Sequence, residues 1–275
     1  MSEIIRIRDA LKKTGFPLEL EVSAVLTERD YDVWGNQFFE HDGKVKEIDM
    51  EAWMPCPSSR SAKKWSLHPN VVIECKMSQR YAWVFHRSAT SIGHCAIAHS
   101  VDAVALSNKS FDHLCNVLDL HYSDPDCDIA STYSVIDPKS GGPCRNKQKD
   151  EIFDAVSHIR EFINYTAKRL IQYYDLERRD IIYFFPLIVL DGMLYEADWH
   201  TRELTVKPVD SIVVETRTVS SVTGQLEPMY IDVVAKRQLT AHLSLVEEEV
   251  RAAARKLSGK RTQNFLNRTL ANRKA

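Results

Sequence analysis

A short apolar run that ends in charged residues is the feature that most constrains how this chain can fold. Val71, Val72 and Ile73 are followed directly by Glu74-Cys75-Lys76. Such a run is typical of a buried strand, and the charges predict that its end opens into a site. Side chains alternate across a strand, so we expect Glu74 and Lys76 on one face and Cys75 in the core.

An acidic residue also lies on a predicted helix upstream of this strand. Residues 17–29 have the amphipathic spacing of a helix, with apolar side chains at Leu18, Val22, Val25 and Leu26. Glu19 and Glu21 lie at similar angles on either side of that apolar stripe. Periodicity alone therefore does not choose between these two acids.

A third acidic position, Asp49, lies within a predicted strand at residues 45–54. An aromatic strand at residues 31–39 precedes it, and the turn residues at 41–44 separate the two. Carboxylates at the ends of neighbouring strands are held rigidly, which oxygen ligands of Mg²⁺ require. A lysine on the same face could orient a water and offset charge that develops on a phosphate.

Together, Glu19, Asp49 and Glu74-Cys75-Lys76 resemble the PD-(D/E)XK nuclease superfamily, nearest to its Mrr-like and Holliday-junction-resolvase-like branches. The resemblance covers roughly residues 15–106. It implies a restriction-endonuclease-like core, with a central mixed β-sheet flanked by helices. It also implies Mg²⁺, replaceable by Mn²⁺, held by Asp49, Glu74, the Cys75 carbonyl and Glu19, with Lys76 assisting the attacking water. The family's spacing from helix to strand favours Glu19 over Glu21.

The sequence departs from the family pattern at two points. Ile48 stands where the pattern has a proline before Asp49. In addition, 24 residues separate Asp49 from Glu74, so the polar segment 55–70 is predicted to be an excursion. We predict weak nucleic-acid contacts for cationic and polar residues in and near the motif: Arg60, Lys63, Lys64, Gln79 and Arg80.

Beyond the motif, the chain divides into three predicted parts. Residues 1–123 would form the nuclease core, 124–148 a loop rich in Asp, Pro, Gly and Ser, and 149–275 a C-terminal α/β extension packed on the core. The extension is predicted to contain a helix at 152–174, strands at 181–190 and 193–197 joined by an Asp191-Gly192 hairpin turn, strands at 211–217 and 229–235, and a helix at 239–257.

Charge is distributed unevenly along the chain. The net charge is −2, but eight Lys/Arg and no acid follow residue 250, so the first 250 residues carry −10. A basic tail suits phosphate contact, although a solvated terminal helix explains it equally well. Six dispersed cysteines without a CxxC pair, and no long apolar stretch or leader, predict a cytoplasmic protein that does not enter a membrane.

The sequence therefore predicts a metal-dependent nuclease, with DNA as the favoured substrate, acting in defence or repair. One alternative is a nuclease-fold subunit that binds or assembles within a larger complex and is inactive alone. Another is a coincidental motif, in which Asp49 and Glu74 merely pair with Lys76. Homodimerisation and an unknown partner subunit stay open.

Overall fold

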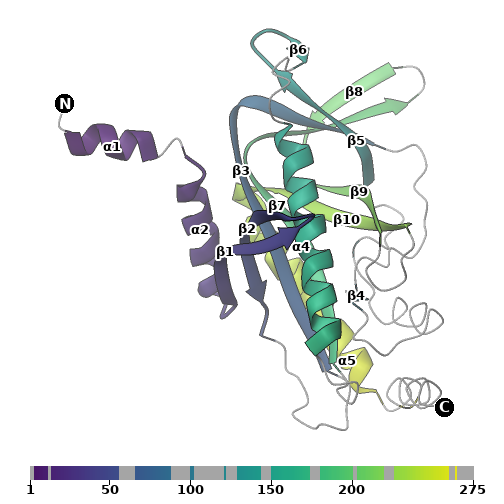
Figure 1. Ribbon diagram of the computed structural model, residues 1–275. Helices are drawn as coiled ribbons and strands as arrows, with labels where there is room; N and C mark the ends of the chain where they lie inside the picture. The colour runs from purple at the N-terminus through teal and green to yellow at the C-terminus, as the bar shows by residue number, and fades with distance from the viewer. Residues whose placement is uncertain are drawn as a thin grey trace.

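The protein is a mixed α/β structure with a large mixed sheet flanked by helices on both faces (Figure 1). The computed structural model describes residues 3–11, 14–55, 66–87, 100–101, 121, 129–143, 150–173, 180–200, 203–219, 226–259 and 264. The helices are α1 (Glu3–Leu11), α2 (Phe16–Thr27), α4 (Glu151–Tyr173), η2 (Lys236–Gln238) and α5 (Leu239–Ser258). The strands are β1 (Asp32–His41), β2 (Lys44–Trp53), β3 (Ser66–Arg87), β4 (Ser100–Val101), β5 (Ile129–Asp137), β6 (Gly142–Pro143), β7 (Asp180–His200), β8 (Glu203–Pro208), β9 (Ser211–Val219) and β10 (Leu226–Ala235).

Two long strands form the spine of the sheet. β3 and β7 pair in parallel from Ser66↔Asp180 to His86↔Ala197. The other edge of β3 pairs first with β2 and then with β5. The other edge of β7 pairs in turn with β4, β10 and β8. Because β5 also pairs with β9, and β9 with β10, the strands β3, β5, β9, β10 and β7 form a closed circuit of pairings.

The long strand β7 corrects the predicted hairpin at Asp191-Gly192. β7 continues through both residues, because β3 pairs with it from Asp180 to Ala197. A Cβ on Gly192 would lie 2.7 Å from the carbonyl oxygen of Ser78. Gly192 therefore permits a close approach of two strands and does not form a turn. The hairpin partner of β7 is β8, further along the chain.

Two other local predictions differ from the structure. The strand expected at residues 71–76 belongs to the 22-residue β3, which also takes in residues 66–70 of the expected loop. The loop expected at 124–148 contains β5 and β6. β5 was missed because its alternation is weak and its stability comes from pairing with β3. The division into residues 1–123, 124–148 and 149–275 stays a prediction, although both ends of the chain contribute strands to one sheet.

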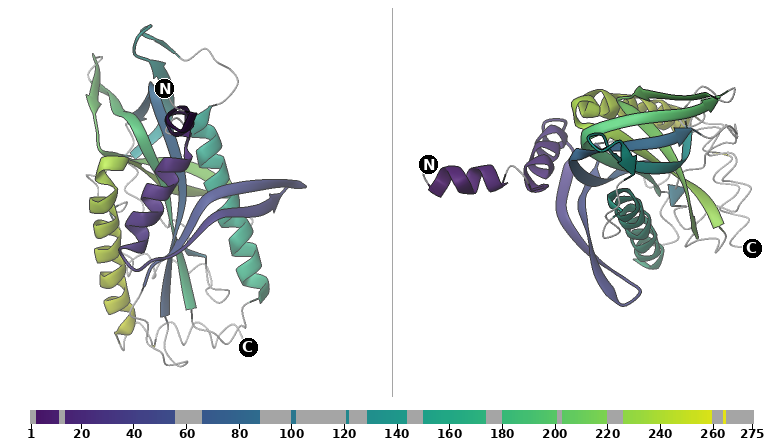
Figure 2. Two further views of the ribbon diagram at one scale, coloured as in Figure 1. Left: turned by 90° about the vertical axis from the view of Figure 1, so that its left-hand side faces the viewer. Right: turned by 90° about the horizontal axis from the view of Figure 1, so that it is seen from above.

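Apolar side chains form a core on each face of the sheet. α4 packs on one face, where its buried Ile152 and Ile159 meet Trp83 and Phe85 of β3. α2 and α5 pack on the opposite face, against Ile73 and Cys75 among others. The right-hand view of Figure 2 shows α4 and α5 on opposite sides of the strands. The helices predicted around α2, α4 and α5 are confirmed.

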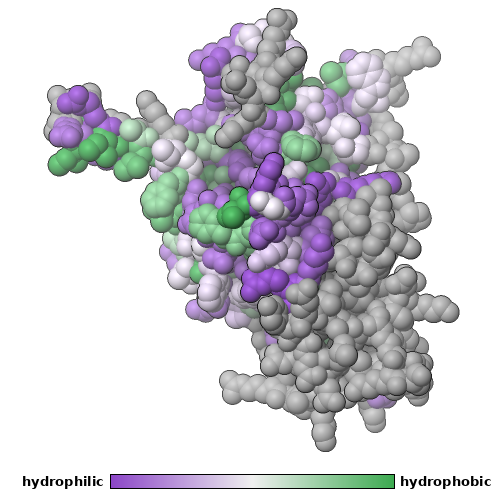
Figure 3. Space-filling view, in the orientation of Figure 1, coloured by the Kyte–Doolittle hydropathy of each residue, from purple (hydrophilic) through white to green (hydrophobic). Residues whose placement is uncertain are grey.

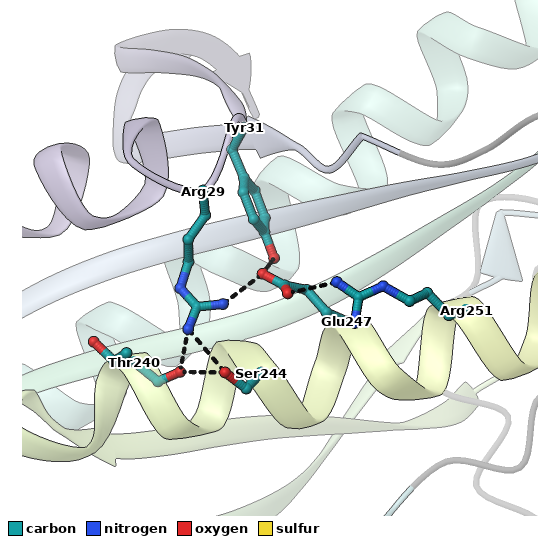
Figure 4. Close-up of polar contacts among 6 residues, drawn as sticks. All are labelled: Arg29, Tyr31, Thr240, Ser244, Glu247 and Arg251. Atoms are coloured by element: carbon teal, nitrogen blue, oxygen red, sulfur yellow. Dashed lines mark hydrogen bonds and ion pairs between the residues drawn. The ribbon is translucent and has the colours of Figure 1, made fainter.

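A polar network fixes the end of α2 to α5 (Figure 4). Arg29 donates to Glu247 Oε1 at 2.7 Å, to Ser244 Oγ at 2.8 Å and to the Thr240 carbonyl at 2.9 Å. The Tyr31 hydroxyl reaches the same Glu247 oxygen at 3.4 Å. Burial, followed by the charge of Glu247, raises the pKa of Tyr31. These contacts hold α2 in a fixed position relative to the sheet.

At the other end of α2, the preceding helix α1 exposes an apolar face (Figure 3). Ile4, Ile7 and Leu11 are 77%, 53% and 51% exposed. Their spacing places them on one side of α1. Of the helices that the structure describes, none has the length and apolar character needed to cross a bilayer.

Candidate active site

The candidate site lies at a break in the pairing of β3. The β2–β3 ladder ends at Met50↔Ile73, and the β5–β3 ladder begins at Ala82↔Ile136. Neither ladder includes residues 74–80 of β3, so within the described residues the backbone pairing with β2 stops before that segment and the pairing with β5 starts after it. Backbone groups and side chains of Glu74-Cys75-Lys76 are therefore not covered there by a neighbouring strand.

Asp49 occupies the point where β2 and β3 separate. Its Oδ2 accepts a hydrogen bond from the Cys75 backbone N–H at 2.7 Å. This side-chain hydrogen bond stands where the β2–β3 ladder would otherwise place its next backbone hydrogen bond. On β1, Asn36 stands opposite Asp49 and has a left-handed φ of +49°, a conformation that asparagine tolerates better than most residues. The regular ladder is interrupted on both sides of Asp49.

Glu74 is almost fully buried and contacts two cationic side chains. Lys76 Nζ pairs with its Oε2, which confirms that both side chains share one face of β3. His158 Nδ1 lies 3.3 Å from its Oε1. Cys75 faces the opposite core as expected, and burial raises the pKa of its thiol.

His158 is the site residue that sequence reasoning missed. It comes from α4, more than eighty residues after Glu74. In the sequence, His158 is a lone histidine on the predicted helix 152–174. Such a histidine does not indicate which strand or site it will contact. Its hydrogen bond to Glu74 raises the pKa of His158, against the opposing effect of burial. This favours the charged imidazolium beside the carboxylate.

The structure separates the two helical acids that periodicity could not distinguish. Glu21 forms an ion pair with Lys236 Nζ, which also lies 3.7 Å from Asp191 Oδ2. Glu19 instead lies within electrostatic range of Glu74 and Lys76. Burial first, and then nearby carboxylates, raise the pKa of Glu19. Of the pair, Glu19 is the acid whose pKa responds to the charges of Glu74 and Lys76.

Electrostatics at this site reflect an excess of carboxylates in a partly buried space. Burial, followed by the charge of Glu74, raises the pKa of Asp49 from 3.8 to about 6. Lys76 and the Cys75 N–H act in the opposite direction. Burial lowers the pKa of Lys76, but Glu74 and Asp49 outweigh it, so the net shift is upward and Lys76 stays protonated. Further positive charge near Asp49 would stabilise its ionised form.

The donor chemistry at this site suits a hard divalent cation. Asp49 and Glu74 offer carboxylate oxygens, and Cys75 offers a backbone carbonyl between them. Among the described residues, no group of three or more His, Cys, Asp or Glu side chains is arranged to hold a metal ion. Mg²⁺ commonly takes only one or two carboxylates, and waters or substrate phosphates complete its shell. Two carboxylates are compatible with that mode of binding.

The predicted nucleic-acid contacts lie apart from the carboxylate group or outside the described part of the chain. Gln79 and Arg80 are exposed in a bulge of β3, because Ser78 pairs with Gly192 and Ala82 with the next residue of β7. Arg80 pairs with Asp137 of β5 at 3.5 Å. The predicted residues of the polar segment, Arg60, Lys63 and Lys64, lie outside the described residues.

A second polar cluster is buried on the α5 face of the sheet. His121 contacts Asp232 Oδ1 at 3.1 Å and Glu249 Oε1 at 2.9 Å, and His242 lies 3.5 Å from Asp232 Oδ2. Burial would raise the pKa of Asp232, but the two histidines outweigh it and lower that pKa. Burial lowers the pKa of His121, yet its acidic partners raise it overall to about 10. These contacts join His121 to β10 through Asp232 and to α5 through Glu249.

Comparison with known proteins gives no relative. No family model, no curated protein and no solved structure matches this chain. Function is therefore argued from the site alone.

Proposed function

We propose that this protein is a metal-dependent nuclease that hydrolyses phosphodiester bonds in nucleic acid, with DNA as the favoured substrate. The observation that carries this proposal is the meeting of Asp49, Glu74 and Lys76 where the β2–β3 ladder ends. Buried carboxylates are costly without cationic partners, and this break in strand pairing is where a substrate could reach them. On this proposal, α2, β1, β2 and β3 belong to a restriction-endonuclease-like core of the PD-(D/E)XK superfamily.

Each site residue then has a distinct role. Asp49, Glu74 and the Cys75 carbonyl would hold Mg²⁺ or Mn²⁺, with Glu19 completing the site directly or through water. A bound divalent ion polarises a phosphoryl oxygen and lowers the pKa of a coordinated water. Lys76 Nζ, which stays protonated, donates to the attacking water or to the phosphate oxygen on which charge develops. His158 orients the Glu74 carboxylate by holding its Oε1.

A second candidate function is a nuclease-fold subunit that binds or assembles within a larger complex. Two observations favour it. The first 250 residues carry a net charge of −10, whereas duplex binding draws on Lys and Arg contacts to phosphates. Glu74 is also already balanced by Lys76 and His158. This candidate predicts no cleavage by the isolated chain.

A cleavage assay with matched lysine variants separates the two candidates. Purified protein is incubated with single- and double-stranded DNA and RNA in Mg²⁺, Mn²⁺ or EDTA. Lys76→Ala tests the site, and Lys236→Ala removes a lysine that pairs with a carboxylate outside it. We expect metal-dependent cleavage that Lys76→Ala abolishes and Lys236→Ala retains.

Other outcomes have equally definite meanings. Folded wild-type protein that cuts nothing would favour the assembly subunit. Cleavage that survives Lys76→Ala would refute the assignment of the site. Calorimetric titration with Mn²⁺ adds a readout independent of turnover, because Asp49→Asn should weaken metal binding.

A further inference from the structure

An aromatic pocket lies beside the candidate site, between the β1–β2 hairpin and α4. Its volume is about 450 Å³, within the range of small-molecule sites. Trp34 and Phe38 of β1 and Trp53 of β2 line one side, and Phe162 and Tyr165 of α4 line the other. Trp34 and Phe38 are 52% and 66% exposed, so large aromatic faces are left accessible there.

The pocket continues directly from the carboxylate site along two elements. Glu51 of its lining lies two residues after Asp49 on β2, about 7 Å along the strand. On α4, Phe162 comes one turn after His158, which contacts Glu74. Tyr165 follows on the same side of the helix. The pocket and the carboxylate site therefore draw on neighbouring positions of the same strand and the same helix.

Two charged residues also line the pocket, Arg169 of α4 and Glu51 of β2. Arg169 is exposed, donates to the Tyr165 hydroxyl at 3.4 Å, and lies 5.5 Å from the centre of that ring. Glu51 Oε1 accepts from Asn70 Nδ2 at 2.6 Å. A carboxylate has about four acceptor positions, so Glu51 can also accept from the amino group of a base. Arg169 supplies a cation for a phosphate.

We infer that this pocket binds an unpaired nucleobase of the strand being cut, beside the scissile phosphate. This inference rests on the proposed nuclease function and names its substrate class: nucleic acid that is single-stranded or has a displaced base. Aromatic side chains stack on any base, and an arginine can add cation–π contact and charge. A base within an intact duplex is covered on both faces by its neighbours and cannot enter such a pocket.

Binding measurements in EDTA test the pocket independently of cleavage. The probes are a short fluorescent single-stranded DNA oligonucleotide and its duplex. Trp34→Leu and Phe38→Leu keep apolar bulk but remove an aromatic face, whereas Trp34→Phe retains one. The matched control is Trp199→Leu, because Trp199 is 67% exposed on β7 and lies outside the pocket lining.

We expect each leucine variant in the pocket to weaken single-strand binding by about 5-fold to 100-fold, the usual effect of losing one stacked aromatic residue. Trp34→Phe and Trp199→Leu should bind nearly as the wild type does, and wild-type protein should prefer the single strand to the duplex. Equal binding by Trp34→Leu, Phe38→Leu and Trp199→Leu would overturn the inference, even if the cleavage assay succeeds. A preference for the duplex would overturn it as well.

A failure of the proposed function would appear in the cleavage assay, whereas a failure of the pocket inference would appear in the binding assay. If the protein lacks metal-dependent cleavage, or Lys76→Ala retains it, the nuclease assignment fails in the cleavage assay alone. The binding assay, which contains no free divalent metal, reads only the pocket.

Discussion

Replacing Asp49 by Asn should stabilise the protein while removing the proposed metal ligand. The ionised carboxylate is partly buried and lies near Glu74, and its pKa is raised for both reasons. Asparagine resembles the protonated acid, and its side-chain oxygen can still accept the hydrogen bond from the Cys75 N–H. The substitution therefore removes a destabilising charge and keeps the local geometry, an exchange of activity for stability.

The size of this effect follows from the pKa of Asp49, which rises from 3.8 to about 6. Each pKa unit corresponds to about 1.4 kcal/mol, so the ionised form costs at most about 3 kcal/mol. A carboxyl whose folded pKa is raised gives full stability below its unfolded pKa and loses stability as pH rises through the folded value. The gain from Asp49→Asn should thus be about 3 kcal/mol at pH 8 and about 0.5 kcal/mol at pH 4.

Urea unfolding of wild-type and variant protein at several pH values measures this difference directly. The control is Asp137→Asn, the same chemical change at a carboxyl whose pKa the backbone N–H of Lys139 lowers. That variant should show no gain in stability at any pH. The reasoning would be refuted if Asp49→Asn destabilised the protein at pH 8, or if its effect did not change between pH 4 and pH 8.

Three further predictions concern packing and charge. Gly192→Ala should destabilise the protein by about 1–3 kcal/mol in urea unfolding, because the added Cβ would meet a backbone oxygen of β3 at 2.7 Å. The control is Gly35→Ala, which should be tolerated because the atom nearest to the added Cβ is 3.9 Å away. Arg29→Ala should lower the free energy of unfolding by about 1–3 kcal/mol, because it removes hydrogen bonds between the end of α2 and α5. Arg251→Ala removes an exposed ion pair with Glu247 within α5 and should lower it by about 0.5 kcal/mol or less. His158→Ala should destabilise the protein more at pH 6 than at pH 9, because a raised histidine pKa gives stability below pH 6.5 that is lost as pH rises through the folded value.

Each of these measurements has a result that would count against its premise. Equal stability of Gly192→Ala and Gly35→Ala would mean that β3 and β7 do not approach as closely as described. Equal costs for the two arginine variants would remove the interhelical network as the anchor of α2. A pH-independent effect of His158→Ala would show that the imidazole is neutral beside Glu74.

The local parts of the fold could be predicted because their signals are local. Apolar spacing marked α2 and α4, aromatic β-prone residues marked β1, and loose alternation after a turn signal marked β2. The side-chain directions around Glu74 also followed from strand geometry alone. Side-chain contacts to α4 could not be foreseen, since no periodicity states which helix will cover a given strand.

The local pattern of residues was enough to identify most helices, the first two strands and the charged end of one buried strand. Tertiary structure alone decided that β3 and β7 pair in parallel along their length, that Asp191-Gly192 continues a strand, and that His158 reaches Glu74. It also placed Glu21 in an ion pair with Lys236 and Glu19 within electrostatic range of Asp49. The physical reason is range: helix and strand periodicities depend on neighbours along the chain, whereas these contacts join segments far apart in it, whose meeting depends on how the whole sheet assembles.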